Sequence, residues 1–265
     1  MIWNVLIPLL ILGILGIVFG LLLGYASKKF AVPQDPLFPE LRDALPGANC
    51  GACGYAGCDA YAKAVAAGEA AVGKCPVGGA KTAEAMGKIM GVAAETGDRM
   101  VAYIRCSGNK DVAGDRYQYH GIHSCNEAAM IPGGGPKLCA YGCLGFGSCL
   151  AVCSFDAIQI VNGVAKVDEK KCKACGSCIK ACPKNLISMV PASLSVRPSC
   201  SNPERGKEVK EVCQVGCIGC GLCMRACEAG AIKMENGLPQ IDASLCTGCH
   251  ACAEKCPVKI IHLAE

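Results

Sequence analysis

Eight cysteines recur after 74 residues, and this internal repeat constrains the fold more than any other feature of the sequence. In the first copy they are Cys139, Cys143, Cys149, Cys153, Cys172, Cys175, Cys178 and Cys182. In the second copy they are Cys213, Cys217, Cys223, Cys227, Cys246, Cys249, Cys252 and Cys256. Each copy also contains two short apolar runs around an Asn-Gly pair, at 162–163 and 236–237. This pattern predicts a β-hairpin with a tight turn in each copy.

The spacing of these cysteines favours iron-sulfur clusters over disulfide bonds. With 24 cysteines among 265 residues, the chain has the composition of either a disulfide scaffold or a protein with extensive metal ligation. Disulfide frameworks belong mainly to short secreted chains, whereas these cysteines recur as C-x2-C-x2-C-x3-C. In a two-cluster ferredoxin, three cysteines of such a run hold one cluster and the fourth holds its neighbour. We therefore expect two ferredoxin-like modules, each with two [4Fe-4S] clusters.

We call this exchange of the fourth cysteine the crossing pattern. It assigns the ligands of three of the four clusters in the two modules directly. In the second module, one cluster is expected to bind Cys217, Cys220, Cys223 and Cys256. The other is expected to bind Cys246, Cys249, Cys252 and Cys227. In the first module, one regular site contains Cys172, Cys175, Cys178 and Cys153.

The remaining site of the first module is irregular, because Phe146 stands at the position that matches Cys220. Its regular ligands are Cys143, Cys149 and Cys182. We expect Cys139 to supply the fourth ligand, because Gly142 and Gly145 make the loop that follows it pliable. The alternatives are a three-iron centre and a site without a cluster.

A separate group of four cysteines precedes the repeat, with the spacing C-x2-C-x4-C-x16-C. Its members are Cys50, Cys53, Cys58 and Cys75. Four cysteines suit a tetrahedral zinc ion equally well, but the ferredoxin motifs in the same chain favour a four-iron cluster. The expectation at this point is five clusters, held by twenty cysteines.

Four cysteines lie outside these five sites. They are Cys106, Cys125, Cys200 and Cys213. Because they divide two and two between the repeats, one hypothesis is that they meet at the junction between the modules and bind a sixth cluster. Buried free thiols are the alternative. The repeat leaves open whether Cys106 or Cys125 corresponds to Cys200.

The N-terminus predicts a single membrane anchor. Residues 5–25 form an uncharged apolar run that is long enough to cross a bilayer as one helix. A secretory signal is the rival interpretation, but no Lys or Arg precedes the run and no A-x-A cleavage site follows it. Lys28 and Lys29 come directly after the run, which by the positive-inside rule places the rest of the chain in the cytoplasm. That compartment is reducing and suits thiolate ligands.

These observations predict an α+β protein with a transmembrane helix, a small mostly helical iron-sulfur domain and two ferredoxin-like modules. Short helices are expected between residues 59 and 99, where Ala-rich segments have helical spacing. The expected boundaries are 1–27 for the anchor, 28–44 for a linker, 45–100 for the four-cysteine domain, 101–195 for the first module and 196–265 for the second.

The other candidate features are weaker. The formal net charge is +4, but five oxidised clusters with their thiolates would carry about ten negative charges, which argues against a nucleic-acid partner. The histidines are scattered, and we interpret them as solvated or capping residues: His120, His123, His250 and His262. Gly133–Gly135 is expected to be a turn. No sequence pattern indicates a catalytic side chain, a nucleotide or a flavin.

Taken together, an apolar anchor, LPGANCGACGYAGC with the distant Cys75, and the GCLGFGSC and GCIGCGLC motifs resemble the B subunit of the Rnf ion-translocating electron-transport complex. The resemblance covers essentially the whole chain and is closest to the long form with the duplicated module. It implies a subunit of an oxidoreductase that couples electron transfer between soluble ferredoxin and NAD, or in some archaea a membrane carrier, to Na+ or H+ movement. Its partners would be the other Rnf membrane subunits and a partner that carries NAD and flavin or is linked to a cytochrome.

The residues themselves indicate an electron relay with no substrate bond chemistry of its own, because clusters cycle by single electrons. The alternative is a polyferredoxin-like subunit of a hydrogenase or another membrane reductase. A zinc-rich structural scaffold is a third interpretation, and it predicts a colourless protein.

Overall fold

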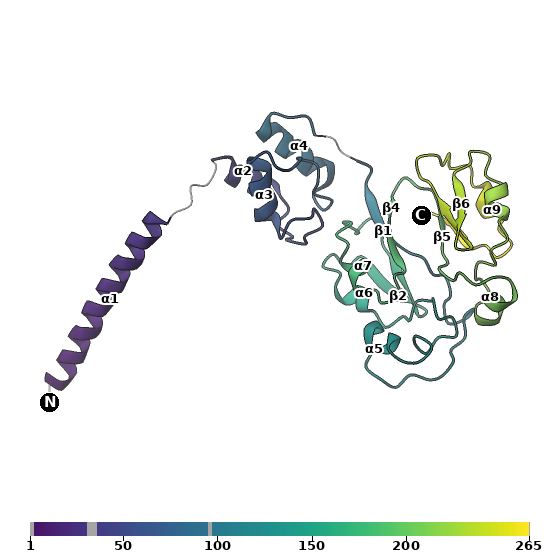
Figure 1. Cartoon of the computed structure of the whole chain (residues 1–265), viewed down its shortest axis with the longest axis horizontal. Helices are drawn as coiled ribbons and strands as arrows, with labels where there is room; N and C mark the ends of the chain where they lie inside the picture. Colours follow the sequence, from purple (N-terminus) through teal and green to yellow (C-terminus); the bar gives the residue numbers. More distant parts are fainter. Residues whose placement is uncertain (1–2, 31–35, 95–96, 265) are drawn as a thin grey trace.

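The computed structural model describes residues 3–30, 36–94 and 97–264. Helix α1, Trp3–Lys29, is the long N-terminal helix of Figure 1. Its segment Leu9–Lys29 is long and apolar enough to cross a membrane, and none of that segment is buried inside the protein. A helix of this kind is stable in a bilayer because all its backbone hydrogen bonds are internal. The predicted N-terminal apolar helix is thus confirmed, and it ends at Lys29.

A small helical domain follows, built from three helices. They are α2, Leu37–Ala44, α3, Cys58–Ala66, and α4, Gly79–Met90. Helix α2 packs against both α3 and α4, and Leu41, Ala62 and Met86 are completely buried where they meet. Helix α4 ends at Gly91, whose left-handed φ of 67° stops the helix without a Cβ penalty.

The structure corrects the expected linker of residues 28–44. Residues 28 and 29 belong to α1, residues 31–35 lie outside the described residues, and α2 is part of the helical domain. The prolines of this segment suggested an extended chain. However, Pro36 precedes the helix, and the fully buried Leu41 gives α2 an apolar contact with the domain core. Tertiary packing therefore decides the conformation of this segment.

The first module contains two antiparallel strand pairs. Strand β1, Met100–Ile104, pairs with β4, Ile187–Pro191, in the register Met100↔Pro191. Strand β2, Ile158–Val161, pairs with β3, Val164–Val167. Three short helices complete the module: α5, Cys125–Ala129, α6, Ser148–Ala151, and α7, Ser177–Ala181.

The second module repeats this plan (Figure 1). Strand β5, Val196–Pro198, pairs with β8, Ile261–Leu263, and β6, Ile232–Glu235, pairs with β7, Leu238–Ile241. Its helices are α8, Lys207–Val212, α9, Leu222–Arg225, and α10, Ala251–Glu254. The two modules have separate apolar cores, which shows that each strand and helix set buries its own apolar face.

Both Asn-Gly hairpins predicted from the sequence are confirmed. In the β2–β3 turn, Asn162 and Gly163 have φ values of 48° and 77°. In the β6–β7 turn, Asn236 and Gly237 have φ values of 50° and 78°. Two successive positive φ values define the turn whose twist matches that of the flanking strands, and Asn-Gly is the pair that adopts it most readily.

Backbone hydrogen bonds next to the β1–β4 and β5–β8 pairs show which residues of the two modules correspond. The Arg105 N–H donates to Leu186 O at 2.8 Å, and the Ser199 N–H donates to Ile260 O at 2.9 Å. Because Leu186 and Ile260 are 74 residues apart, Arg105 corresponds to Ser199. Cys106, which follows Arg105, therefore corresponds to Cys200.

This alignment reveals an insertion in the first module. The segment between Cys106 and Cys139 is 20 residues longer than the segment between Cys200 and Cys213. We call residues 107–138 the insertion segment, and it contains α5. It is the largest difference between two otherwise similar modules.

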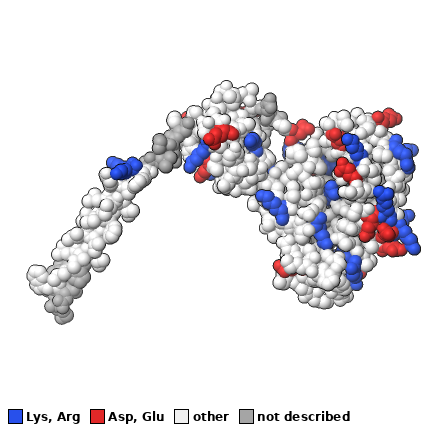
Figure 2. Space-filling view, in the orientation of Figure 1, with Lys and Arg blue, Asp and Glu red and all other residues white. Residues whose placement is uncertain are grey.

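Figure 2 shows Lys, Arg, Asp and Glu side chains over the visible face of the two modules, but a buried arginine joins the modules. Arg197, at the centre of β5, is 2% exposed and forms an ion pair with Glu169 of the first module. Its Nη2 also donates to Pro191 O at 3.3 Å, and its guanidinium lies 5.6 Å from the ring centroid of Tyr103. A guanidinium that is paired, hydrogen-bonded and stacked can be buried without a large loss of stability. The modules are therefore docked through specific polar contacts.

Candidate metal centres

All 24 cysteines lie in the described part of the chain and are free thiols. The disulfide interpretation therefore has no support in the structure. Among the described residues, no three His, Cys, Asp or Glu side chains are placed to hold a metal ion directly. A single zinc ion would draw its sulfurs to within about 2.3 Å of one point. The cysteines instead surround hollows, which fits a larger group such as an iron-sulfur cluster.

The first such hollow lies in the helical domain. Four cysteines line it, and we call them the N-terminal group: Cys50, Cys53, Cys58 and Cys75. The side-chain oxygen of Asn49 accepts a hydrogen bond of 2.8 Å from the Cys58 N–H, which fixes the start of α3. The Gly78 N–H lies 3.4 Å from the sulfur of Cys75. Such N–H donors stabilise a thiolate that carries negative charge.

Two hollows of the second module each collect four cysteines from both halves of the module. The inner group, next to the first module, consists of Cys217, Cys220, Cys223 and Cys256. The outer group consists of Cys227, Cys246, Cys249 and Cys252. Cys220 and Cys249 are exposed, whereas the other cysteines are buried or half-buried. These groupings agree with the crossing pattern expected from the sequence.

The first module forms one group of the same kind. Its outer group consists of Cys153, Cys172, Cys175 and Cys178, as the spacing predicts. The Ala102 N–H of β1 lies 3.4 Å from the sulfur of Cys172. Burial raises the pKa of Cys178 to about 11, and the neighbouring thiols raise it as well. These sulfurs are thus close enough to influence one another.

The inner group of the first module differs from the sequence expectation, because Cys125 takes the place that was expected for Cys139. Burial raises the pKa of Cys149 to about 12, and three neighbouring thiols contribute to this shift: Cys143, Cys125 and Cys182. The Cys125 N–H donates a hydrogen bond of 2.8 Å to Ser148 Oγ, directly beside Cys149. We therefore define the inner group of the first module as Cys125, Cys143, Cys149 and Cys182.

Phe146 holds the insertion segment in this position. Its ring packs against Tyr119, with a centroid separation of 5.0 Å, and edge-on against His123 at 5.5 Å. Both partners lie just before α5, which begins at Cys125. The residue that replaces a cysteine of the repeat thus anchors the segment that carries Cys125. No local spacing rule could have placed Cys125 in this group, since it is 18 residues from the nearest other member.

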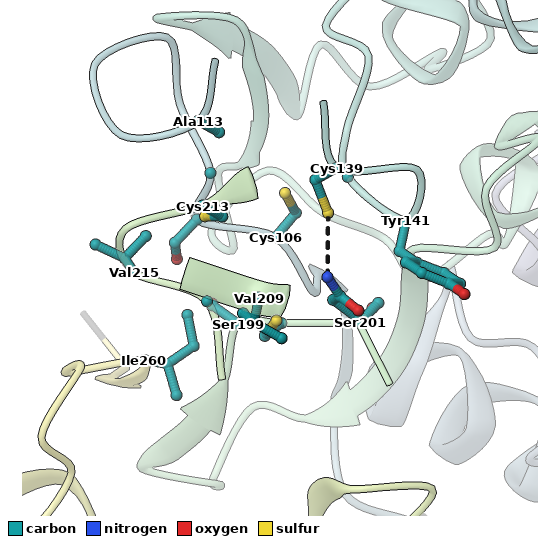
Figure 3. A pocket seen from close by; sticks show the side chains of 16 residues that line it. Cys106, Ala113, Cys139, Tyr141, Ser199, Ser201, Val209, Cys213, Val215 and Ile260 are labelled. Atoms are coloured by element: carbon teal, nitrogen blue, oxygen red, sulfur yellow. Dashed lines mark hydrogen bonds between the residues drawn. The ribbon is translucent and has the colours of Figure 1, made fainter. Parts of the chain in front are cut away.

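Cys139 instead belongs to a hollow between the two modules (Figure 3). Four cysteines line this hollow, and we call them the junction group: Cys106, Cys139, Cys200 and Cys213. Burial raises the pKa of Cys139 to about 11, and the charges of the three other cysteines act in the same direction. The Asn202 side chain lies 3.8 Å from the sulfur of Cys139, as the dashed line in Figure 3 marks. The hypothesis of a junction group is thereby modified, because Cys139 replaces Cys125 in it.

Backbone hydrogen bonds connect the junction group to both inner groups in the same way. The Cys143 N–H lies 3.3 Å from the sulfur of Cys106, and the Cys217 N–H lies 3.4 Å from the sulfur of Cys200. Cys143 and Cys217 are equivalent positions of the repeat, and so are Cys106 and Cys200. The junction group therefore has an approximate twofold symmetry, and it touches an inner group on each side.

One histidine lies at a cysteine group: His250 lines the hollow of the outer group of the second module, and it precedes α10 with a φ of 62°. His123 packs on Phe146. The Nε2 of His262 lies 2.7 Å from Ser107 Oγ, and burial lowers its pKa.

Three family models match this chain, and each falls on cysteine groups. The model described as "Putative Fe-S cluster" matches residues 45–77. The model described as "4Fe-4S binding domain" matches residues 165–188, and the model described as "4Fe-4S dicluster domain" matches residues 216–260. These matches support iron-sulfur clusters in the helical domain and in both modules, and they favour such a cluster over zinc in the N-terminal group.

Curated proteins similar to this chain include three members of ion-translocating complexes, each of them the B subunit of its complex. The one from the Na+-translocating ferredoxin:NAD+ oxidoreductase complex of Acetobacterium woodii is 46% identical, over 97% of this chain and 77% of its own length. The one from the proton-translocating ferredoxin:NAD+ oxidoreductase complex of Clostridium ljungdahlii is 44% identical, over 97% and 92%. The one from an ion-translocating oxidoreductase complex of Methanosarcina acetivorans is 40% identical, over 94% of each chain.

Proposed function

Because this chain belongs to the family of B subunits of Rnf ion-translocating oxidoreductase complexes, we propose that its 24 cysteines hold six [4Fe-4S] clusters in one electron-conducting series. Family membership makes the chain a membrane iron-sulfur electron-transfer subunit of such a complex. The proposal adds the number of clusters, their ligands and their order. The ligand sets are the six cysteine groups defined above.

The grouping of the cysteines is the observation that carries this proposal. Every cysteine of the chain falls into one of six groups of four, and no thiol remains outside. Four thiolates are the usual ligand set of one [4Fe-4S] cluster. The N–H donors beside Cys75, Cys106, Cys172, Cys200 and Cys256 supply the outer-shell hydrogen bonds that such sulfurs use.

The contacts of the junction group give the order of the series. Cys143 and Cys217 each donate a backbone hydrogen bond to a junction sulfur, so the ligands of the inner groups touch the ligands of the junction group. Five of the six groups are thereby joined into one row: outer, inner, junction, inner, outer. The N-terminal group precedes this row along the chain, on the side of the anchor. When bound, the clusters cycle by single electrons, and the chain's own residues hold them, space them and shield them from water.

We propose that soluble ferredoxin exchanges electrons with the second module and that the other Rnf subunits receive them near the anchored end. Cys220 and Cys249 are the exposed cysteines, and both belong to the second module, where a soluble protein can approach. The apolar helix α1 fixes the opposite end of the chain at the bilayer. With Lys28 and Lys29 at its C-terminal end, the positive-inside rule places the cysteine groups on the cytoplasmic side.

Metal analysis of the full chain, purified anaerobically with its anchor in detergent, tests the proposal. We expect about 24 iron atoms and about 24 acid-labile sulfides per chain, the content of six four-iron clusters. About 20 of each would mean that one group is empty. Absence of sulfide would overturn the proposal altogether. Protease accessibility in sealed vesicles of known orientation tests the cytoplasmic placement separately.

A further inference from the structure

Lys137 is a buried cation without a carboxylate partner. Its side chain is only 6% exposed, and in the described part of the chain only Arg197 is another buried Lys or Arg. Arg197 has Glu169 as its counter-charge, whereas no ion pair of Lys137 occurs among the described residues. An unpaired buried charge is destabilising unless another negative group compensates it. The position of Lys137 therefore requires an explanation.

The ammonium of Lys137 lies between two cysteine groups. Its Nζ donates to Cys143 O at 2.9 Å and to Gly108 O. Cys143 is a member of the inner group of the first module, and Gly108 lines the junction hollow together with Cys139. The thiolates of these two groups, with their bound clusters, are the negative charges closest at hand for Lys137.

The electrostatics of the two groups agree with this placement. Burial raises the pKa of both Cys143 and Cys213, and the charge of Lys137 acts in the opposite direction on each of them. Cys143 belongs to the inner group and Cys213 to the junction group. One ammonium thus acts on sulfurs of both groups.

Among its described residues, 196–264, the second module has no equivalent buried cation. The position 74 residues after Lys137 is Glu211, which is exposed and lies 3.7 Å from Lys207 on the surface of α8. Lys137 is therefore not required by the ferredoxin-like plan itself, since the second module has the same plan without it. It belongs to the features that distinguish the first module from the second.

We propose that Lys137 is a positioning residue that raises the reduction potentials of the inner cluster of the first module and of the junction cluster. The inference rests on the proposed function, because it requires clusters at both groups. Reduction adds one negative charge to a cluster, and a fixed positive charge nearby stabilises the reduced form. Lys137 would therefore favour electrons on these two clusters over the clusters of the second module.

The test is a redox titration of the full anaerobic chain, followed by electron paramagnetic resonance, for the wild type and for Lys137→Met. We expect two clusters of the variant to become harder to reduce, each by about tenfold in its one-electron equilibrium constant, or about 59 mV. The other clusters serve as internal references and should not shift. Unchanged potentials with a full iron content would overturn the proposal.

Three further variants separate charge from structure. Lys137→Arg retains the charge and should leave both potentials close to those of the wild type. Lys207→Met removes an exposed lysine of α8 and should shift no cluster. Lys137→Gln removes the charge but keeps donors for the two carbonyl oxygens, so it replaces Lys137→Met if that variant loses iron. If both neutral variants lose the clusters, Lys137 is a structural residue and the proposal fails.

Iron analysis of the wild type distinguishes this failure from failure of the proposed function. A wild-type chain with fewer than about 24 iron atoms would question the six clusters themselves. If the wild type has the full iron content but the Lys137 variants have the same reduction potentials as the wild type, only the proposed role of Lys137 is contradicted.

Discussion

The two ferredoxin-like modules hold the same number of cysteine groups but complete their inner groups differently. In the second module, Cys220 comes from the short loop that also carries Cys217 and Cys223. In the first module, Phe146 occupies the matching position, and Cys125 arrives from the insertion segment. A fourth sulfur can thus move to another segment of the chain, provided that the fold delivers it to the same hollow.

The comparison also shows how the replacement is stabilised. Phe146 packs against Tyr119 and His123, so the residue at the position of Cys220 contacts the segment that brings Cys125 to the inner group. The same insertion segment contains Lys137, which has no buried counterpart among the described residues of the second module. One insertion therefore changes both the fourth thiol and the local charge of the inner group, while both hairpins keep the same Asn-Gly turn.

The largest expected effect comes from removing cysteines in pairs. Cys106→Ala/Cys125→Ala should damage two clusters and bring the iron content from about 24 towards about 16. Cys106→Ala/Cys139→Ala should damage only the junction cluster and leave at least about 20. The iron and acid-labile sulfide contents per chain of both double variants are the measurement. If Cys106→Ala/Cys139→Ala lost more iron than Cys106→Ala/Cys125→Ala, Cys139 and not Cys125 would be the member of the inner group.

A rescue variant tests whether a cysteine at position 146 can replace Cys125 in the inner group of the first module. Cys125→Ala should convert or empty the inner group of the first module, because three thiolates hold a four-iron cluster poorly. Adding Phe146→Cys restores the loop pattern of the second module and should recover the lost iron, up to about four atoms. Cys125→Ala with Phe146→Ser is the matched control. If both combinations give the same iron content, position 146 cannot replace Cys125.

The packing of Phe146 predicts a moderate effect on the insertion segment. Phe146→Leu removes two aromatic contacts, each worth about 0.5–1.5 kcal/mol, while it retains part of the apolar volume. We expect faster hydrogen exchange in residues 119–129 and little change elsewhere in the chain. Uniform acceleration over both modules would contradict a local role. Tyr55, which packs on Tyr61 in the helical domain, offers a control substitution, Tyr55→Leu.

The smallest effects are expected at the two Asn-Gly turns, and they should differ between the modules. Asn162→Ala and Asn236→Ala each place alanine at a positive φ, which costs about 1 kcal/mol for a residue without a short polar side chain. Asn162→Ala also removes the hydrogen bond of 2.6 Å that Asn162 Nδ2 donates to Asp111 of the insertion segment. It should therefore destabilise β2–β3 more than Asn236→Ala destabilises β6–β7, as hydrogen exchange of each hairpin measures. Equal effects would mean that this contact with the insertion segment does not support the first hairpin.

The sequence by itself determined the features that depend on neighbouring residues. The C-x2-C-x2-C runs, the Asn-Gly turns and the N-terminal apolar run each act over a few residues, so their spacing alone predicted four of the six cysteine groups, both hairpins and α1. The same local logic failed at residues 37–44, because their helix depends on the burial of Leu41.

Only the tertiary structure decided which cysteine completes the inner group and which completes the junction group. Distance along the chain is compatible with either Cys125 or Cys139, and the choice depends on where the packing of Phe146 holds the insertion segment. The burial of Lys137 depends on the same segment. Ligands and charges from separate segments converge only when the whole chain is folded, which is why no spacing rule could assign them.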